Sequence, residues 1–513
     1  MTVAFALLEN IRSPMSIIRM PNGDLAYQPI GNMEDLVPES LVGILPPLYP
    51  EWLGGRTFAA THRIRFPYVV GEMARGIATP AMAVAAARAG FFGFFGSAGL
   101  PLPAIEAGIV FMQKEIGADH PGWGVNLIHS PQDPDQEMAT VALILRCGLT
   151  RVSASAFMSL APAVLLYAAK GLTRAADGRI VRRHYVFAKV SRPEVARHFL
   201  SPAPLAMLKT LVESGLLSAE EAELATQLPV AEDITVEADS GGHTDGRPLT
   251  VLLPVILALR DRLTAEHGYE VAPRIGAAGG LGTPTALAAA FAAGAAYVVT
   301  GSVNQCSQES GLSVDAQSML ATAGPADIAM APAADMFELG VKVQVLQRGT
   351  FFAQRAQRLY EAYGRYNSID DIPTIERQKL EQQVLGRAID EIWAETQAYF
   401  KQHDPREVIR AEQEPRHRMA LVFRWYLFMA SQWARDGVSA RRADYQIWCG
   451  PAMGAFNDWV RGSFLEPPDQ RSVVQIGRNL LEGAAIVTRT HHLRLCGIVI
   501  PDNAFNFTPR PLG

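Results

Sequence analysis

Between residues 66 and 302 the sequence alternates short β-rich runs with stretches rich in Ala and Leu. Runs such as Tyr185–Val190 (YVFAKV) are almost wholly apolar, which is typical of parallel strands covered on both faces. We expect eight strands: Tyr68–Ala74, Phe91–Phe95, Gly122–Ile128, Arg151–Ala154, Tyr185–Val190, Ile234–Ala238, Arg274–Ala277 and Tyr297–Thr300. Eight strands with intervening helices in roughly 240 residues favour an α/β protein with a (β/α)8 TIM barrel over an open sheet.

Two segments of this region share a pattern. Gly76–Gly90 reads GIATPAMAVAAARAG and Gly280–Gly294 reads GLGTPTALAAAFAAG, so that Gly, Thr-Pro and the closing Gly coincide without a gap. Repetition of one βα unit explains the match. Convergent use of Thr as N-cap, Pro at the first helical position and Gly at the C-terminus explains it equally well. Both explanations predict the same local structure, a capped helix ending in glycine.

Composition excludes several classes of protein. At 513 residues, 49% hydrophobic and 19% charged, the chain is expected to be globular with a large core. A net charge of −5 gives no support for nucleic acid or an anionic membrane as partner. The four cysteines are widely spaced and form no CxxC pair, and no basic leader precedes the first apolar run, so we expect a cytoplasmic protein without disulfides. The long apolar segments are either broken by charges and prolines or too short to span a bilayer.

The chain is expected to divide into three segments. Residues 1–55, rich in Pro and Gly, are interpreted as a wrapping segment, residues 56–305 as the barrel, and residues 306–513 as a mainly helical subdomain. Helical periodicity in the last segment covers Gly340–Gly364, Ile375–Phe400, Met419–Ala434 and Ser472–Leu481. Within the barrel, Arg192–Pro229 is interpreted as an enlarged helical crossover whose SAEEAELA helix opens on a Ser cap.

Two glycine turns predict a phosphate site. Gly279-Gly280 follows the seventh predicted strand, and Gly301-Ser302 follows the eighth. Glycine lets the backbone approach an anion closely, and exposed N–H groups at a helix start favour negative charge. One such turn alone is more often a plain tight turn, but two at neighbouring strand ends match the phosphate site of many barrels. No GK[ST] follows, and the seventh strand is not the place of a dinucleotide fingerprint.

His243 lies in the stretch TVEADSGGHTDGRP, where a predicted strand ends and Gly241-Gly242 follow. Barrel enzymes place catalytic groups at the carboxyl ends of strands, and His changes its charge near neutral pH. A histidine that only hydrogen-bonds within a turn is the alternative. The strand-end position and the polar neighbours favour a functional role.

Other polar residues end predicted strands. Lys189 closes the apolar run YVFAKV, where a charge is costly unless it faces an anion or an electron-poor ring at the top of the barrel. Asn126, Ser153 and Ser155 also lie near strand ends, and for them capping of the next helix is an equal alternative. Cys306 follows the eighth strand, but with no base nearby in sequence it is interpreted as structural. No metal-binding spacing of the HExxH kind is present.

With these residues in order, the chain resembles a known family. The motifs GEMARGIATP, GVNL, FAKV, EADSGGHTDGRP, IGAAGGLGTP and VVTGSVNQ resemble the FMN-dependent 2-nitropropane dioxygenase-like barrels. Two further segments, DMFELGVKVQVLQRGTFFAQRAQRLYEAY and DYQIWCGPAMGAFNDWV, resemble the PfaD-type trans-acting enoyl reductases of polyunsaturated fatty acid and polyketide synthases. The similarity spans nearly the whole chain.

The resemblance implies FMN on the top face, with its phosphate at Gly279-Gly280 and Gly301-Ser302. Lys189 would stabilise the reduced, anionic ring, and His243 matches the active-site histidine that faces the substrate. The implied catalytic residues are His243 and Lys189. The implied FMN-binding residues are Met73, Ala74, Asn126, Ser153, Lys189, Asp239, Ser240, Gly241, Gly242, Gly279, Gly280, Thr300, Gly301 and Ser302.

The implied reaction reduces an α,β-unsaturated thioester with NADPH or NADH as the reductant. An acyl carrier protein would present the substrate, and the helical region after residue 305 would dock it. Carrier proteins are acidic, so a basic patch is expected, with Arg441-Arg442 and Arg435 or the Arg348–Arg358 helix as candidates. A nitronate monooxygenase on the same barrel is the alternative, and a flavin-binding scaffold subunit is a third. A homodimer is possible.

Overall fold

The computed structural model describes residues 9–30, 40–131 and 133–513. These residues form two compact units. The first contains the described residues up to Asp239, together with Asp245–Ser310 and Ala455–Gly513, and the second contains Ser240–Thr244 and Gly311–Gly454. Residues 455–513, which the sequence placed in the helical subdomain, are therefore part of the first unit.

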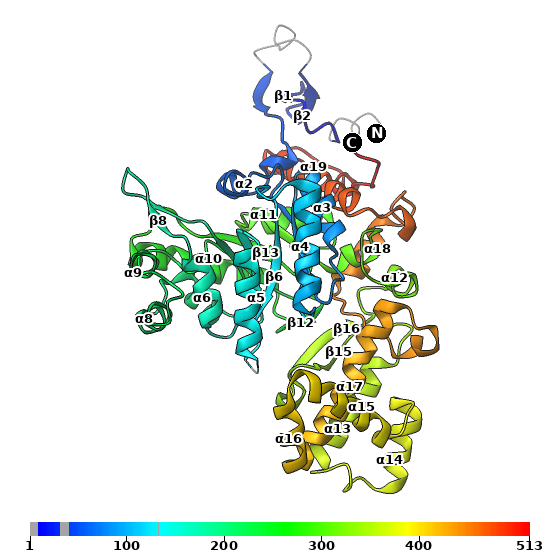
Figure 1. Cartoon of the computed structure of the whole chain (residues 1–513). Coiled ribbons are helices and arrows are strands. Elements are labelled where there is room, and N and C mark those ends of the chain that lie inside the picture. Colours follow the sequence, from blue (N-terminus) through cyan, green and yellow to red (C-terminus); the bar gives the residue numbers. More distant parts are fainter. Residues whose placement is uncertain (1–8, 31–39, 132) are drawn as a thin grey trace. The chain divides into compact units, whose positions relative to one another are not determined.

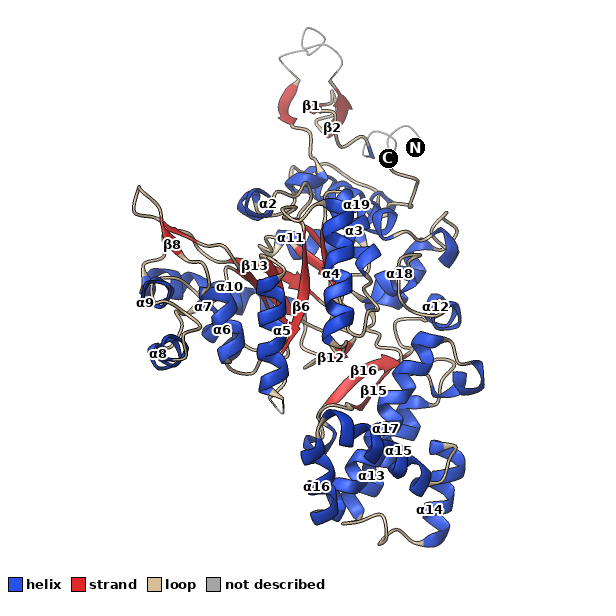
Figure 2. Ribbon diagram, viewed as in Figure 1, coloured by secondary structure: helices blue, strands red, loops and turns tan. Residues whose placement is uncertain are grey.

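The first unit contains a closed parallel barrel of eight strands, which confirms the predicted fold (Figure 2). Around the barrel the strands follow the order β10-β11-β13-β14-β4-β5-β6-β7. Their bounds are β4 Tyr68–Val70, β5 Phe92–Phe95, β6 Trp123–Ile128, β7 Arg151–Ser155, β10 Tyr185–Val190, β11 Asp233–Glu237, β13 Arg274–Ala278 and β14 Val298–Thr300. β4 is shorter than predicted, because the chain turns at Arg75 and Gly76, where φ is 60° and 73°.

Aromatic side chains make up much of the buried barrel interior. Phe58, Phe92, Phe94, Phe187 and Tyr297 belong to one buried cluster, in which the rings of Phe58 and Tyr297 stack with centroids 4.2 Å apart. Gly276 makes room for this cluster, since a Cβ there would stand 2.3 Å from the Tyr297 ring. The strands are thus held by packed side chains, and polar groups are left for their ends.

A buried ionic cluster lies at the amino-terminal ends of these strands. Asp233, the first residue of β11, accepts two hydrogen bonds from the guanidinium of Arg274 at 2.6 and 2.7 Å. Its Oδ2 also lies 3.0 Å from Nε2 of His62, and the Asp233 and His62 side chains are fully buried. The cluster ties β11 and β13 to the helix Arg56–His62, at the end of the barrel opposite the predicted site.

Helices surround the barrel, and the predicted caps are present. Thr79 accepts a hydrogen bond from the N–H of Met82, and Thr283 from that of Ala286. The helices of the first unit are α2 Arg56–His62, α3 Pro80–Arg88, α4 Leu102–Ile116, α5 Pro134–Arg146, α6 Pro162–Ala169, α7 Pro193–Leu200, α8 Leu205–Glu213, α9 Ala219–Ala225, α10 Leu249–His267, α11 Pro284–Ala292 and α19 Val473–Leu495. Helix α9 opens on the predicted Ser cap, Ser218, and Glu221 completes a capping box with it. Helix α18 (Ala452–Val460) begins in the second unit and ends in the first.

The described part of the amino-terminal segment forms a small antiparallel sheet. Its strands are β1 Met15–Arg19, β2 Leu25–Pro29 and β3 Leu41–Leu45. Met15 and Ile17 pack on Leu493 and Ile498 near the end of α19. Residues 1–8 and 31–39 of the predicted wrapping segment lie outside the described residues. A hairpin of β8 (Thr173–Arg174) and β9 (Ile180–Val181) follows α6.

The second unit combines helices with a three-stranded sheet (green to orange in Figure 1). Its strands, in the order β12-β16-β15, are β12 Gly242–His243, β16 Lys342–Leu346 and β15 Ile328–Pro332. Its longer helices are α12 Val314–Ala321, α13 Phe352–Arg365, α14 Thr374–Leu380, α15 Ile389–His403, α16 Pro405–Gln413 and α17 Pro415–Asp436. The predicted helix over Gly340–Gly364 is wrong in its first half, because KVQVL pairs with β15 along five residues.

Candidate functional site

Lys189 lies near the carboxyl end of β10 between two carboxylates. Its Nζ is 3.0 Å from Oε1 of Glu237, at the end of β11, and 3.2 Å from Oε1 of Glu72, which follows β4. The exposed side-chain fractions are 16% for Lys189, 4% for Glu72 and 21% for Glu237. Burial by itself would lower the pKa of Lys189, but Glu237 and Glu72 outweigh burial and raise the pKa above its usual value. Lys189 is therefore a permanent cation and a poor proton donor.

A network of hydrogen bonds links Glu72 to residues of β7 and β6. The Ser153 hydroxyl donates to Oε1 of Glu72 at 2.8 Å. Asn126 Nδ2 donates to the Ser153 carbonyl at 3.0 Å and to the Ser155 hydroxyl at 2.9 Å. Neither Asn126 nor the serines cap the next helices: Asp133 caps α5, and α6 has no side-chain cap. Asn126, Ser153 and Lys189 are thus brought together at the carboxyl ends of neighbouring strands, as the sequence suggested.

The two glycine turns follow β13 and β14, which are neighbours in the barrel. Gly279 and Gly280 have φ of 87° and 72°, a conformation that favours glycine. A Cβ on Gly279 would lie 2.8 Å from the backbone of Ala238 and 2.9 Å from that of Asp239. Gly279 thus allows the end of β13 to pack against the end of β11.

Gly280 and Gly301 differ from Gly279 in facing open space. A Cβ on Gly280 would meet no atom within 4 Å, and one on Gly301 would meet only Met73 Cγ at 4.0 Å. Two glycine positions with open space therefore follow β13 and β14 at one end of the barrel, and backbone of this kind can approach an anion closely. Met73 and Ala74 come next to this region because they follow β4, the neighbour of β14.

Thr300 and Cys306 are buried and contribute to the protein interior. The Thr300 hydroxyl is 2.6 Å from the Tyr68 hydroxyl and accepts from Asn304 Nδ2 at 3.0 Å, and Thr300 is buried. Ser302 opens the short helix Ser302–Cys306 that follows Gly301. Burial raises the pKa of the Cys306 thiol to about 12, so Cys306 is a structural residue and no thiolate nucleophile, in agreement with its interpretation from sequence.

His243 belongs to the second unit. It pairs with Val343 in the β12-β16 ladder, and its Nε2 lies 3.2 Å from Oδ1 of Asp335. Both side chains are exposed, by 39% and 51% respectively. The imidazole is therefore oriented by a carboxylate and remains accessible, as a proton-transferring histidine must be.

The residues before His243 are held by close backbone packing within the second unit. A Cβ on Gly241 would stand 2.9 Å from the Cys449 nitrogen, and one on Gly450 would stand 3.0 Å from the Gly241 nitrogen. The Ser240 carbonyl accepts from Gln344 Nε2 at 2.9 Å. This face of Gly241 is therefore covered by protein.

Sequence reasoning missed Glu72 and Glu237 as partners of Lys189. Glu72 lies in the motif GEMARGIATP and Glu237 in the motif EADSGGH, and each follows or ends a strand. The signal that could have found them is the cost of burying Lys189, since a buried ammonium requires carboxylate partners at the same end of the barrel. Asp335, the partner of His243, lies 92 residues further along the chain and has no signal of this kind.

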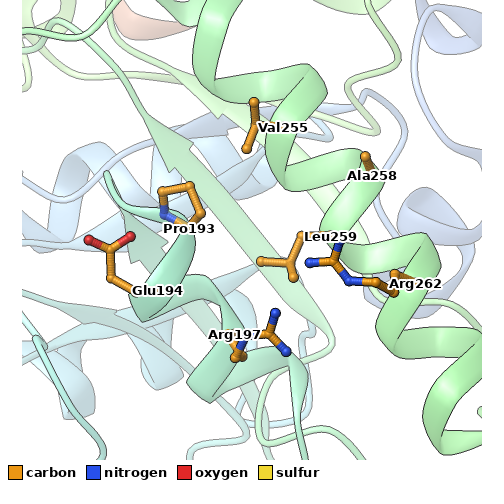
Figure 3. Close-up of a pocket in the computed structure, with 7 residues that line it drawn as sticks. All are labelled: Pro193, Glu194, Arg197, Val255, Ala258, Leu259 and Arg262. Carbon is orange, nitrogen blue, oxygen red and sulfur yellow. The ribbon is translucent and has the colours of Figure 1, made fainter.

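A separate hollow of about 440 Å³ lies between α7 and α10 on the outside of the barrel (Figure 3). Leu259, Ala258 and Val255 form an apolar side, and Arg197 and Arg262 border it (Figure 3). It contains none of the residues at the strand ends. The chemistry expected from the sequence therefore belongs to the strand ends and not to this hollow.

A closed parallel barrel of eight strands, with a buried ammonium and open glycine turns at the carboxyl ends of its strands, defines the class of TIM-barrel proteins. Comparison with solved structures narrows the class. The enoyl reductase domain of MlnA, from the macrolactin biosynthesis cluster of Bacillus amyloliquefaciens, is 35% identical, with a TM-score of 0.83, and the match covers 87% of this chain and 99% of that domain. A mutant form of FabK from Thermotoga maritima, 18% identical with a TM-score of 0.51 over 86% of this chain and 99% of its own, shares the fold.

Sequence comparison finds relatives named for polyunsaturated fatty acid and polyketide synthesis. A polyunsaturated fatty acid synthase subunit of Thraustochytrium sp. is 45% identical over 86% of this chain and 30% of its own length. The polyketide biosynthesis protein PksE of Bacillus subtilis is 43% identical over 85% of this chain and 56% of its own length. The chain thus spans about a third and about half of these relatives, respectively. Residues 366–445 also match the inserted helical domain of [acyl-carrier-protein] S-malonyltransferase.

The chain belongs to the family of PfaD-type enoyl reductases of polyunsaturated fatty acid and polyketide synthases. The relatives that define it are synthase subunits and an enoyl reductase domain, which agrees with the resemblance of the sequence motifs. Among the described residues, no helix has the length and apolar character needed to cross a bilayer.

Proposed function

We propose that the chain is an FMN-dependent, trans-acting enoyl reductase that reduces α,β-unsaturated thioesters on an acyl carrier protein with NADPH or NADH. The observation that carries this proposal is the pair of open glycine turns beside the buried Lys189 cluster at the carboxyl ends of the barrel strands. Membership of the enoyl reductase family supports it.

The residues at the strand ends fit a flavin mononucleotide. Gly280 and Gly301 leave open space where side chains would otherwise stand, as a phosphate cradle requires. Their N–H groups and those of Gly279 and Ser302 would hold the phosphate. The ring would lie beside Asn126, Ser153 and Lys189, with Met73, Ala74 and Asp239 at its edges. Gly241 and Thr300 are less suited to contact it, because protein atoms already cover them.

Bound FMN would supply the two-electron chemistry, taking electrons from the nicotinamide and passing them to the β-carbon of the thioester. The protein must then provide a proton at the α-carbon and stabilise the negative charge that develops on the thioester oxygen. Lys189 holds its proton too tightly to act as the donor. His243, which is accessible and oriented by Asp335, is proposed as the donor.

An acyl carrier protein is the proposed partner. The relatives are proteins of polyunsaturated fatty acid and polyketide biosynthesis, and residues 366–445 match a domain named after an enzyme that acts on carrier proteins. These residues lie in the helices of the second unit, which we propose as the docking surface.

Anaerobic mixing tests the proposal. The protein with bound FMN is reduced with NADPH, and a crotonyl thioester on a carrier protein is then added. Bleaching of the flavin absorbance followed by its recovery with the thioester supports an enoyl reductase. Recovery with a nitronate and oxygen only would identify a nitronate monooxygenase instead, and no bleaching at all would identify a flavin-binding scaffold.

A further inference from the structure

Glu72, Lys189 and Glu237 form a compact charged cluster with two carboxylates and one ammonium. Each comes from a different strand of the barrel: Glu72 follows β4, Lys189 lies in β10 and Glu237 ends β11. The formal charge of the cluster is therefore −1. Ser153 adds a neutral hydrogen bond to Glu72.

The charges of this cluster are held in place by burial and by mutual contact. Glu72 is almost fully buried, and Oε1 of each glutamate contacts the same ammonium nitrogen. Buried charges are screened far less by salt and water than exposed ones. A ring bound beside the cluster would therefore experience the sum of the three charges and not the positive charge of Lys189 alone.

We propose that Glu72 and Glu237 are positioning residues that fix the Lys189 ammonium and lower the reduction potential of the bound flavin. The inference rests on the proposed function, because it requires a flavin at the strand ends. Reduction adds negative charge to the ring. A lone Lys189 would favour that charge, whereas the cluster with both glutamates disfavours it.

This role differs from the one that the sequence suggested for Lys189. The resemblance implied a cation that stabilises the reduced ring. With two carboxylates in contact, Lys189 retains its hydrogen-bonding capacity but loses its net positive field. A lower potential makes the reduced flavin a stronger donor toward the thioester, which suits an enzyme that works in the reducing direction.

Potentiometric titration of the bound flavin tests the inference independently of turnover. Glu72→Gln and Glu237→Gln keep the shape of the side chain and remove one negative charge each. Each is expected to shift the reduction equilibrium at least tenfold toward the reduced form, about 30 mV for a two-electron couple. Lys189→Met is expected to shift it in the opposite direction. Glu220→Gln, at an exposed position of α9, is the matched control and should leave the potential unchanged.

The outcomes separate the inference from the proposed function. A wild-type protein that binds no flavin or does not reduce the thioester would overturn the proposed function. A wild-type enzyme that does both, with a potential that neither glutamine variant shifts, would overturn the inference alone. Glu237 is partly exposed, so Glu237→Gln decides the question even if the variant at buried Glu72 does not fold.

Discussion

Gly301 combines a negative φ with open space around its Cα. Its φ is −124°, and a Cβ would approach no atom closer than 4.0 Å. Gly301→Ala is therefore expected to fold normally while its methyl group occupies the space proposed for the phosphate. We expect at least tenfold weaker FMN binding, with an unchanged Tm of the flavin-free protein, measured by fluorescence titration and thermal melts. Gly43→Ala, in β3 and equally unobstructed, is the control. Unchanged FMN affinity would remove Gly301 from the phosphate site.

His243 is expected to act in turnover and not in cofactor binding. Its ring is accessible and contacts Asp335, and neither of these two side chains is buried. His243→Ala should keep bound FMN and slow turnover by two to four orders of magnitude, roughly the contribution of a general acid. Stopped-flow absorbance separates the reduction of FMN by NADPH, which should persist, from its reoxidation by the thioester, which should slow. Loss of FMN from this variant would instead assign His243 a structural role.

His184 makes stability depend on pH. It is buried, and its Nδ1 lies 2.6 Å from the Lys170 carbonyl. Burial, aided by the charges of Arg183 and Arg182, lowers the pKa of His184 to about 4 from 6.5. The unfolded chain therefore takes up the proton first, so stability present above pH 6.5 is lost as the pH falls toward 4. The loss is about 3 kcal/mol at the lower pH.

Urea unfolding of His184→Asn checks this dependence. Asn can still donate to the Lys170 carbonyl but does not titrate, so the stability of the variant should fall less between pH 7 and pH 4.5 than that of the wild type. His198→Asn, at an exposed position of α7, should follow the wild-type curve. Parallel curves for wild type and His184→Asn would contradict the assignment.

At the residue scale, the sequence predicts single positions better than contacts. Lys189 and His243 were singled out because a charge or an imidazole at a strand end needs a reason, and their functional roles stay predictions. The contacts of Lys189 depend on how the strands are placed around the closed barrel, where β11 is the neighbour of β10 and β4 lies across the barrel from it. Glu72 and Glu237 lie 117 residues before and 48 residues after Lys189, and only the strand order brings them together.

At the scale of elements, the strand β12 depends on glycine packing. Gly241 and Gly450 lack side chains where the backbones of residues 240–242 and 449–450 meet. A methyl group at Gly241 would overlap the Cys449 backbone, which cannot move as a flexible side chain does. Gly241→Ala is expected to destabilise the second unit by about 1–3 kcal/mol and to slow turnover through displacement of His243.

The same variant separates packing from cofactor binding. If Gly241 serves packing alone, Gly241→Ala should bind FMN within about twofold of the wild type when titrated below its melting temperature. Gly364→Ala, in α13 of the same unit and with nothing near its Cα, is the control. A large loss of FMN affinity in Gly241→Ala would show that Gly241 contacts the cofactor, as the resemblance implied.

Helices and strands were predictable where the apolar pattern of a segment agreed with the capping or turn residues at its ends. Each barrel strand begins or ends within two residues of its predicted limits, apart from the carboxyl end of β4. That end is irregular because Arg75 and Gly76 take left-handed conformations, which the sequence does not reveal for Arg75. KVQVL alternates polar and apolar residues as a strand does, and it was missed because the helical periodicity of the segment after it was extended over these five residues.

At the scale of the whole molecule, the order of segments along the chain does not predict which of the two compact units each segment joins. Residues 240–244 belong with the helical unit although barrel segments flank them on both sides, and residues 455–513 return to the barrel unit. The return depends on long-range packing: a Cβ on Gly483 of α19 would stand 2.6 Å from the ring of Pro284, the first residue of α11. No local sequence pattern in residues 455–513 predicts that α19 packs on α11.

The proposed docking of a carrier protein gives a prediction at this scale. Of the candidate basic residues, Arg441 stacks on Trp433 and pairs with Asp444 at 2.9 Å, Arg348 pairs with Asp327 at 3.1 Å, and Arg435 pairs with Asp436 at 3.4 Å. Arg442 is exposed, and its side chain forms no hydrogen bond or ion pair with any residue that the structure describes. Arg355 pairs with Asp444, and Arg358 donates to the neutral Gln383 at 3.1 Å. Arg442 is therefore the arginine of this set whose side chain has no described partner, and its charge is available to an acidic partner.

Arg442→Glu is expected to lower kcat/KM for a crotonyl thioester on a carrier protein about three- to tenfold at low salt, because it replaces an attraction by a repulsion. The same thioester on free pantetheine should react as in the wild type, since it lacks the protein surface. Raising the salt to about 0.5 M should reduce the difference, because exposed charges are screened over a few ångströms there. Arg406→Glu, an equal charge reversal in the same unit at a residue paired with Asp404, is the control. Equal losses in both variants would indicate a general field effect and would exclude Arg442 as a docking contact.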